Sequence, residues 1–400
     1  MAWAGRALRA GPGAAATVRP MSDALVPFRV EVPESDIVDL QDRLARTRWP
    51  ERETVTDWSQ GVPLAYVQEV CETWRTTYDW RACEARLNGH DQYRTEIDGL
   101  GIHFLHVRSP HEGALPLVLT HGWPGSIVEF LKVIDPLTNP TAHGGRAEDA
   151  FHVVCPSLPG YGFSDKPTEH GWKVERIADA WAVLMVRLGY TAWGAQGGDW
   201  GSAVTTAIGV RHPGPCVGIH LNMVSARPSP EHMNDLTDRE KEGLAALQEY
   251  VDVDSGYSKE QATRPQTVGY ALVDSPSGQA AWILEKFWKW TDCNGHPEHA
   301  LSRTEMLDDI SVYWFTRSAA SSARLYWESF GAFRGDDPVR VPVGAAIFPK
   351  EIFRPSRRWA EAKHPDIRQW HEFDKGGHFA AFEQPATFVD DVRSFFRLVR

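Results

Sequence analysis

The chain has 400 residues, of which 42% are hydrophobic and 24% charged; it is long enough for two or three structural units, and this balance excludes wholesale disorder, collagen and coiled coil. The formal net charge of -11 argues against a nucleic-acid partner, which would need a basic surface. No apolar run approaches the ~18 residues that a membrane-spanning helix needs, and five scattered cysteines are typical of reduced thiols in a cytoplasmic protein.

The N-terminus is not expected to act as a secretory signal. Residues 1–20 are rich in Ala, Gly and Arg, and Gly11-Pro12-Gly13 interrupts the only stretch that could serve as the apolar region of such a signal. We therefore predict that residues 1–23 form a disordered extension without function. A transit peptide and a true start at Met21 are the alternatives.

Residues 24–116 are predicted to form an N-terminal domain of helices followed by strands. Apolar side chains recur at helical spacing in two stretches, which contain Ile37, Leu40 and Leu44 and then Tyr66, Val67, Val70 and Trp74. Residues 93–108 alternate as two strands with a turn at Asp98-Gly99.

Over residues 117–225, short apolar strands alternate with amphipathic helices, which is typical of a mostly parallel sheet with helices on both faces. Strands are expected at residues 117–120, 151–156, 192–196 and 217–221, and helices at residues 127–137, 174–188 and 202–211. Ser126 and Glu129 have the spacing of a capping box, which predicts where the first of these helices begins.

The alternation stops at residue 226. Residues 226–337 are aromatic and helical in pattern, with no clear strand, and predict a helical cap inserted into the α/β fold. The core is expected to resume over residues 338–400, with strands at residues 343–348 and 367–373. A last helix presents an apolar face made by Phe388, Val389, Val392, Phe396 and Val399.

The segment Gly197-Gly198-Asp199-Trp200-Gly201 is the most informative, because it follows one predicted strand and opens the next helix. Such a sharp turn with small residues is the nucleophile elbow of α/β hydrolases, where a serine is usual. Here the residue is Asp199, and a carboxylate suits displacement at an sp³ carbon, which leaves an alkyl–enzyme ester. The alternative is a tight turn in which Asp199 caps the helix.

A second loop, His121-Gly122-Trp123-Pro124, follows the strand at residues 117–120. In α/β hydrolases a loop at this place supplies one backbone donor of the oxyanion hole. The N–H groups of Trp123 and Trp200 are therefore predicted to face an oxyanion together. His121 itself is expected to be structural, and an ordinary turn between strand and helix is the alternative for the whole loop.

The base and its acid partner are expected near the C-terminus. His378, which two glycines precede in the loop before the last helix, can reach back over the sheet edge and activate water. The chain order nucleophile, acid, histidine places the acid just after the strand at residues 343–348, where Glu351 stands. Glu351 would orient His378 and stabilise its cation. Asp366 and Asp374 are the competing candidates.

These segments together resemble an epoxide hydrolase; they are His121-Gly122-Trp123-Pro124-Gly125-Ser126, Gly197-Gly198-Asp199-Trp200-Gly201 and Gly376-Gly377-His378-Phe379. Residues 24–116 are similar to the N-terminal domain of the microsomal-type branch, which includes insect juvenile-hormone epoxide hydrolases and related fungal and bacterial enzymes. The resemblance extends from about residue 24 to the end of the chain. It implies an α/β-hydrolase fold and the conversion of an epoxide and water into a vicinal diol, with no cofactor and no metal.

The resemblance also implies the residues of the site. The roles of nucleophile, base and acid partner fall on Asp199, His378 and Glu351. Two cap tyrosines would donate hydrogen bonds to the epoxide oxygen, and Tyr326 and Tyr257 stand in the matching contexts. Tyr250 is close by and is the alternative to Tyr257.

Seventeen tryptophans favour either an aromatic-lined pocket or a tryptophan-rich core. Trp123, Trp200 and Phe379 are the predicted pocket residues, and an apolar epoxide is the expected substrate. A haloalkane dehalogenase would use the same aspartate, with Trp200 as halide ligand, but by resemblance it lacks the tyrosines and the N-terminal domain. A non-catalytic relic that binds a small apolar ligand would have lost a catalytic residue, and none is lost.

Membrane-bound members of this branch carry an N-terminal anchor helix, which residues 1–20 cannot form. We therefore expect a soluble, cytoplasmic enzyme without a membrane span. Residues 24–116 are expected to wrap the core and brace the cap, or to form the surface of a homodimer.

Overall fold

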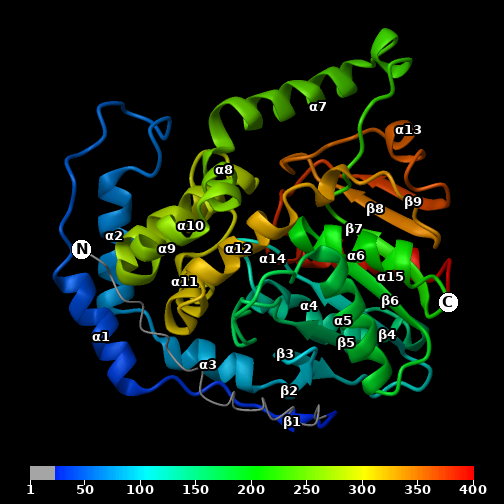
Figure 1. Ribbon diagram of the computed structural model, residues 1–400, viewed down its shortest axis with the longest axis horizontal. Helices are drawn as coiled ribbons and strands as arrows, with labels where there is room; N and C mark the ends of the chain where they lie inside the picture. The colour runs from blue at the N-terminus through cyan, green and yellow to red at the C-terminus, as the bar shows by residue number, and fades with distance from the viewer. Residues whose placement is uncertain (1–22) are drawn as a thin grey trace, which may run out of the picture.

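The structure is a computed structural model that describes residues 23–400, so the expectations for the segment before residue 23 lie outside the described residues. Within this range, one nine-stranded sheet has the order β1-β2-β3-β5-β4-β6-β7-β8-β9 (Figure 1). Its strands are β1 (Val26–Pro27), β2 (Gln92–Ile97), β3 (Leu100–Val107), β4 (Leu115–Thr120), β5 (Phe151–Pro156), β6 (Trp193–Gly197), β7 (Cys216–Leu221), β8 (Val343–Ile347) and β9 (Ile367–Glu372).

The sheet is parallel from β5 to β9 in this spatial order, and β1, β2 and β3 add an antiparallel edge. Positions 194 and 197 of β6 point to opposite faces, because side chains alternate along a strand. A side chain at Gly194 would lie 2.3 Å from Phe396 of the last helix, and one at Gly197 would lie 2.2 Å from the carbonyl oxygen of Gly201. Helices therefore cover both faces, as the alternating pattern predicted.

On one face α5 packs against α6, and on the other α4 packs against α15. The longer helices are α1 (Glu34–Ala45), α2 (Leu64–Thr76), α3 (Trp80–Asn88), α4 (Leu131–Thr138), α5 (Val174–Arg187), α6 (Asp199–Arg211), α7 (Asp238–Glu249), α8 (Gly256–Thr263), α9 (Pro265–Asp274), α10 (Pro276–Trp290), α11 (Arg303–Thr316), α12 (Ala319–Ser329) and α15 (Pro385–Phe396). Short helices are η1 (Ile127–Phe130), the π-helical turn η5 (Tyr250–Asp254), α13 (Arg357–Ala360) and α14 (Ala380–Glu383).

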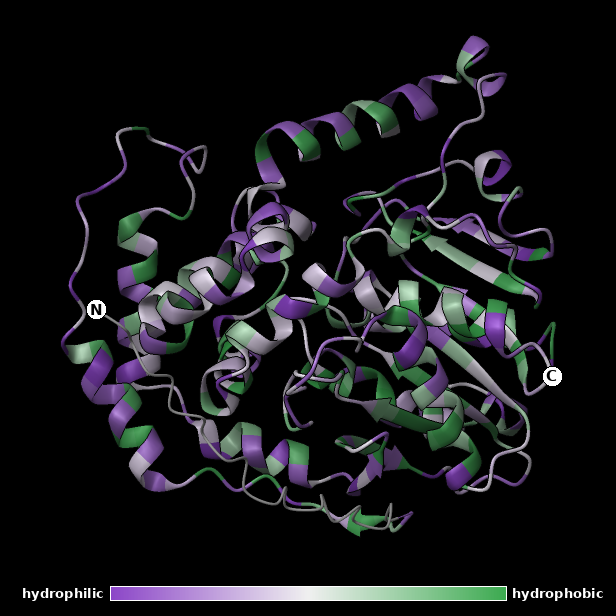
Figure 2. Ribbon diagram, viewed as in Figure 1, coloured by the Kyte–Doolittle hydropathy of each residue, from purple (hydrophilic) through white to green (hydrophobic). Residues whose placement is uncertain are grey.

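Hydrophobic residues gather on the inner strands and on the helices that flank them, whereas α7 is hydrophilic over much of its length (Figure 2). Strands with both faces covered are apolar throughout, which explains why the inner strands appear in the sequence as short continuous apolar runs. None of the helices within residues 23–400 has the length and apolar character needed to cross a membrane.

The N-terminal segment contacts two parts of the molecule. Its strands β1–β3 extend the core sheet, and its helices α1–α3 lie against α10 and α11 (Figure 1). The indole Nε1 of Trp74 donates to the hydroxyl of Ser311 (2.9 Å), and the hydroxyl of Tyr78 donates to Asp308 Oδ1 (2.9 Å). Both acceptors lie on α11, so this segment holds the helices of the insertion from one side.

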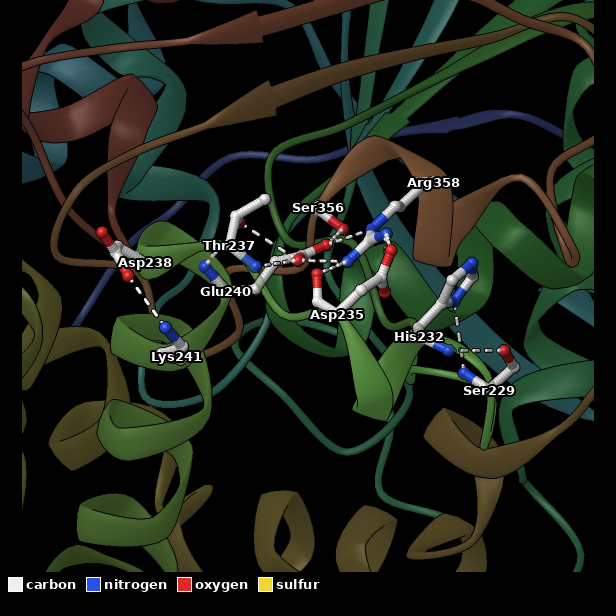
Figure 3. A network of polar contacts seen from close by, with 9 residues as sticks. All are labelled: Ser229, His232, Asp235, Thr237, Asp238, Glu240, Lys241, Ser356 and Arg358. Atoms are coloured by element: carbon white, nitrogen blue, oxygen red, sulfur yellow. Dashed lines mark hydrogen bonds and ion pairs between the residues drawn. The ribbon is translucent and has the colours of Figure 1, made fainter.

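The chain between β7 and β8 forms the helices α7–α12, which we call the cap, and this described stretch contains no strand, as predicted. Figure 3 shows how the entry to the cap is attached to the core. Thr237 and Glu240 form a capping box at the start of α7. The guanidinium of Arg358 on α13 donates to both carboxylate oxygens of Glu240 (2.6 Å each) and also to Asp235 (3.1 Å). Arg358 thereby holds the pKa of Glu240 well below its usual value.

The hairpin of β2 and β3 confirms the predicted turn, since Asp98 and Gly99 both have positive φ (50° and 75°), as a tight two-residue hairpin turn requires. Helix α3 was not expected from the sequence. Asp79 caps it by accepting the N–H of Arg81 at 2.9 Å.

The predicted capping box of Ser126 and Glu129 is only half present. Ser126 accepts the N–H of Val128 (3.3 Å) and donates to Asp309 Oδ1 (2.7 Å). The carboxyl of Glu129 does not accept the backbone N–H of Ser126. It lies over Gly125 instead, where a Cβ would be 1.4 Å from Oε1. The first turn is 3-10 helical rather than α-helical, and this places the Glu129 side chain differently.

Candidate active site

Asp199 stands at the turn where β6 ends and α6 begins. Its backbone is left-handed, with φ of +48°, and its side chain is buried. The turn is tight, because a Cβ at Gly201 would lie 1.9 Å from the carbonyl oxygen of Thr120 and one at Gly122 would lie 2.2 Å from Asp199 Oδ1. The helix starts at the aspartate itself and not at Ser202, so Asp199 belongs to the first turn of α6.

The loop after β4 faces this carboxylate. The backbone N–H of Trp123 donates to Asp199 Oδ1 at 2.8 Å. His121 is structural, as expected: its Nδ1 lies 2.9 Å from the carbonyl oxygen of Gly122, and its Nε2 accepts the N–H of Leu158. Burial lowers the pKa of His121 to about 4, so its imidazole is neutral.

His378 connects Asp199 to Glu351. Its Nε2 lies 3.4 Å from Asp199 Oδ2, and its Nδ1 lies 2.7 Å from Glu351 Oε1. Both the imidazole and the Glu351 carboxylate are buried. The loop that carries His378 is fixed by its backbone, because the N–H of His378 donates to the carbonyl oxygen of Trp290 (2.9 Å) in the cap.

Two carboxylates determine the direction in which the pKa of His378 is shifted. Burial by itself disfavours a charged imidazole, but Glu351 and Asp199 outweigh this effect and raise the pKa of His378 well above its ordinary value. A charge on the imidazole of His378 is thus paired on both sides, as a buried charge requires.

The structure brings Glu351, and neither of its competitors, into contact with His378. Asp366 pairs with Arg368 at 3.0 Å, and Asp374 is exposed. Glu351 follows β8 and reaches the imidazole from there, which is the position that the chain order predicts.

The cap contributes three tyrosines to the same region. The ring of Tyr257 on α8 stacks on Trp123, with centroids 4.9 Å apart, and the ring of Tyr326 on α12 meets Trp123 edge-on at 5.9 Å. The hydroxyl of Tyr250 lies 3.0 Å from that of Tyr257. The ring centroids of Tyr257 and Tyr326 lie 5.8 Å apart.

The hydroxyls of Tyr257 and Tyr326 are both protonated in the resting site. Burial is the main reason that the pKa of Tyr326 is raised well above its usual value, and the carboxylate of Asp199 adds to the effect. Burial likewise raises the pKa of Tyr257, with smaller contributions from Tyr326 and Tyr250. Each hydroxyl can therefore donate a hydrogen bond.

A small pocket lies beside the side chains of Asp199 and His378. Trp123 and Phe379 line it, and so does the half-buried Glu129. Sequence reasoning did not assign Glu129 to the site, because its spacing from Ser126 was explained by helix capping.

Trp200 does not line this small pocket, which also lacks Tyr257 and Tyr326, so its place in a substrate pocket stays a prediction. Its ring packs against Tyr326 (4.8 Å between centroids) and Phe333 (4.9 Å). Successive residues of a helix point about 100° apart, so the residue after the nucleophile faces a different direction. The expectation for its backbone N–H is separate, since the N–H groups in the first turn of a helix have no partner within the helix.

Two further residues fix the histidine loop and had been missed. The carboxylate of Glu383 accepts the N–H groups of Phe379 (3.0 Å) and Asp292 (2.8 Å), and burial raises its pKa to about 7. Trp290 supplies a backbone carbonyl, which leaves no mark in a sequence. Glu383 could have been found, because an acid four residues after the histidine loop can cap the short helix α14.

Two known families match this chain, and together they cover residues 25–252. The family described as epoxide hydrolase N terminus matches residues 25–130, and the family described as alpha/beta hydrolase fold matches residues 116–252. A candidate epoxide hydrolase from Stigmatella aurantiaca is 60% identical over 94% of this chain and 86% of its own length. Epoxide hydrolase 1 from Oryctolagus cuniculus is 37% identical over 97% of this chain and 92% of its own length.

Comparison with solved structures points to the same family. The epoxide hydrolase of Aspergillus niger superposes with a TM-score of 0.86 at 33% sequence identity, covering 95% of this chain and 98% of that one. These likenesses span the N-terminal segment, the core and the cap together. The chain therefore belongs to the epoxide hydrolase family, in its microsomal-type branch, and is an enzyme with the α/β-hydrolase fold.

Proposed function

We propose that the enzyme converts an apolar epoxide and water into a vicinal diol through a covalent ester on Asp199. The arrangement of this carboxylate supports the proposal most directly. Oδ1 accepts the N–H of Trp123 at 2.8 Å, while Oδ2 faces His378 at 3.4 Å. One oxygen is held as an ester carbonyl would be, and the other is available to attack carbon.

In the first half-reaction, Asp199 Oδ2 forms a bond to an epoxide carbon as the bond from that carbon to oxygen breaks. The electron pair moves onto the epoxide oxygen, which takes a proton from a tyrosine hydroxyl. Tyr257 and Tyr326 donate to this oxygen, and their rings lie 5.8 Å apart over Trp123. The product is a hydroxyalkyl ester on the enzyme and a tyrosinate.

In the second half-reaction, His378 removes a proton from water, and the hydroxide attacks Cγ of the ester. The negative charge develops on Oδ1, where the N–H of Trp123 donates, and the N–H of Trp200 is proposed as the second donor. Collapse of this intermediate releases the diol and the carboxylate of Asp199. The proton left over returns the tyrosinate to a phenol, so no proton is lost or gained overall.

The two half-reactions require different charge states of His378. With Asp199 ionised, the pKa of His378 is raised well above its usual value. Formation of the ester removes the charge of Asp199, so the pKa of His378 falls. After alkylation His378 therefore gives up its proton to solvent and becomes the base that hydrolysis needs, and it takes a proton back when the carboxylate of Asp199 is restored.

The surroundings of the site favour a substrate with apolar substituents. The ring of Trp290 lies 6.2 Å from that of Trp123 and 6.4 Å from that of Phe379. Ligand sites with largely aromatic walls and few polar groups bind apolar molecules and orient them by those polar groups.

Haloalkane dehalogenation is the second candidate, since it uses the same nucleophile. The paired phenols favour an oxygen leaving group, which accepts a proton, over a halide, which does not. The indole of Trp200, the proposed halide ligand, is instead engaged by Tyr326, one of the two phenols.

The deciding experiment is a single turnover of styrene oxide, with enzyme in excess, in oxygen-18 water, beside a parallel assay with 1-bromobutane. We expect a diol whose new oxygen comes from the enzyme in the first turnover and from solvent in later ones. Solvent oxygen in the first turnover would contradict the ester route. Bromide release without diol would assign the dehalogenase reaction instead.

Replacement of Glu351 by glutamine is expected to slow hydrolysis of the ester by roughly 10²-fold, because a neutral partner no longer stabilises the imidazolium at 2.7 Å. Alkylation should change far less, since His378 does not act in it. The two rates are separated by stopped-flow fluorescence. Asp374→Asn is the matched control, and if it slows hydrolysis instead, Glu351 is not the acid.

A further inference from the structure

The cap contains a buried lysine that the proposed mechanism does not use. Lys286 on α10 is only 1% exposed. Its Nζ lies 2.7 Å from Glu285 Oε1 and 3.2 Å from Asp254 Oδ1, and it also stands 4.3 Å from the ring centroid of Tyr257. Lysine is almost never fully buried unless it is paired, so the burial of Lys286 depends on these partners.

Asp254 fixes this ammonium in place. One of its carboxylate oxygens faces Lys286, and the other accepts the indole N–H of Trp290 at 2.7 Å. Asp254 ends the π-helical turn η5, which begins at Tyr250, the residue whose hydroxyl lies 3.0 Å from that of Tyr257. Such turns are rare and occur often at functional sites. The turn thus places Tyr250 directly against Tyr257, and it places Asp254 where it holds Lys286 against the same ring.

The two tyrosines of the pair have unlike surroundings. The Tyr257 ring is contacted by the ammonium of Lys286 and stacks on the indole of Trp123. The ring of Tyr326 is contacted edge-on by the indoles of Trp123 and Trp200, and within the described part of the chain no cation lies over it. A cation over a phenol ring stabilises negative charge that develops on it, and does so most strongly where water is excluded.

We propose that Lys286 is a positioning residue that makes Tyr257 the tyrosine that transfers its proton, while Tyr326 only donates a hydrogen bond. As the epoxide C–O bond breaks, the O–H bond of Tyr257 breaks too, its proton moves to the epoxide oxygen and the electron pair stays on the phenol oxygen. The charge is then stabilised by Lys286 over the ring and by the hydroxyl of Tyr250. Hydrolysis of the ester later returns the proton.

This inference rests on the proposed function, in which the phenols act during alkylation. Several groups lie around the phenol: Lys286 from α10, Tyr250 and Asp254 from η5, Tyr326 from α12 and Asp199 from the core. Only Lys286 carries a positive charge among them. Removal of this charge is therefore expected to slow the transfer of the proton from Tyr257 to the epoxide oxygen.

The test uses Lys286→Met in the full chain, with Lys286→Arg as the variant that keeps the charge. Single turnovers of styrene oxide give the alkylation and hydrolysis rates separately. We expect Lys286→Met to slow alkylation by roughly 10- to 30-fold, with hydrolysis within about 3-fold. The basic limb of the alkylation profile should move to higher pH, and Lys286→Arg should restore most of the rate. Because Met leaves Asp254 unpaired, Lys286→Met/Asp254→Asn provides a second variant that removes both charges.

The decisive comparison places Lys286→Met in two backgrounds. In Tyr257→Phe its effect on alkylation should vanish, and in Tyr326→Phe it should persist, since residues that act through one another are not additive. An equal effect in both backgrounds, or an equal slowing of alkylation and hydrolysis, overturns the inference. A separate result, an unchanged alkylation rate in Tyr257→Phe alone, would show that the proposed role of this tyrosine fails, whatever Lys286 does.

Discussion

Replacement of Asp199 by alanine is expected to lower kcat for styrene oxide by roughly 10⁴-fold or more, because the covalent route needs a carboxylate at the end of β6. Alanine has no atom that can displace the epoxide oxygen. It also leaves the N–H of Trp123 without its acceptor. Diol formation is followed by chromatography, and the intact mass of the protein should show no adduct after incubation with substrate.

The backbone at this position requires a matched control. Residue 199 has φ of +48°, a conformation that costs alanine about 1 kcal/mol and that asparagine adopts more readily. Asp199→Asn keeps the volume of the side chain and an oxygen that can accept the N–H of Trp123. Equal loss of activity in both variants, with an unchanged Tm for Asp199→Asn, assigns the effect to the carboxylate. Near-normal turnover by the asparagine variant would remove Asp199 as the nucleophile.

Replacement of His378 by glutamine is expected to divide the reaction in two. Alkylation requires only Asp199 and the phenols, so it should proceed, whereas hydrolysis loses its base and should slow by about 10³-fold. The ester then accumulates. Mass spectrometry of the intact protein should show an increase equal to one substrate molecule, and a peptide that contains Asp199 should carry it.

His170→Gln serves as the control, since His170 is exposed on the surface. It should show neither the adduct nor the loss of turnover. If His378→Gln forms diol at an ordinary rate, or if the adduct is found on a residue other than Asp199, the proposed order of events is wrong.

Much of the site was predictable because its signals are local. Small residues around Asp199 mark a turn that few sequences can form, and the glycines before His378 mark a loop between a strand and a helix. Glu351 follows from the order of the elements. In each case a few adjacent residues determine both the backbone and the chemical group.

The remainder depends on contacts between distant parts of the chain. Lys286 lies among aromatic residues of a helix, and nothing near it in the sequence shows that Asp254 will pair with it. The antiparallel edge of the sheet arises because β3 pairs with β5, which lies almost fifty residues further along the chain. The direction of the Trp200 ring likewise depends on where α6 begins.

The cap is attached on more than one side: by Arg358 at its entry, by Trp74 and Tyr78 along α11, and by Ser126, which donates to Asp309. A lid with one hinge can swing open as a body, but an element fastened on two sides cannot do so without breaking bonds on one of them. Substrate and diol must then pass through openings made by individual side chains. For bulky epoxides, the width of that passage, and not the reactivity of the ring, becomes the barrier that selects among them.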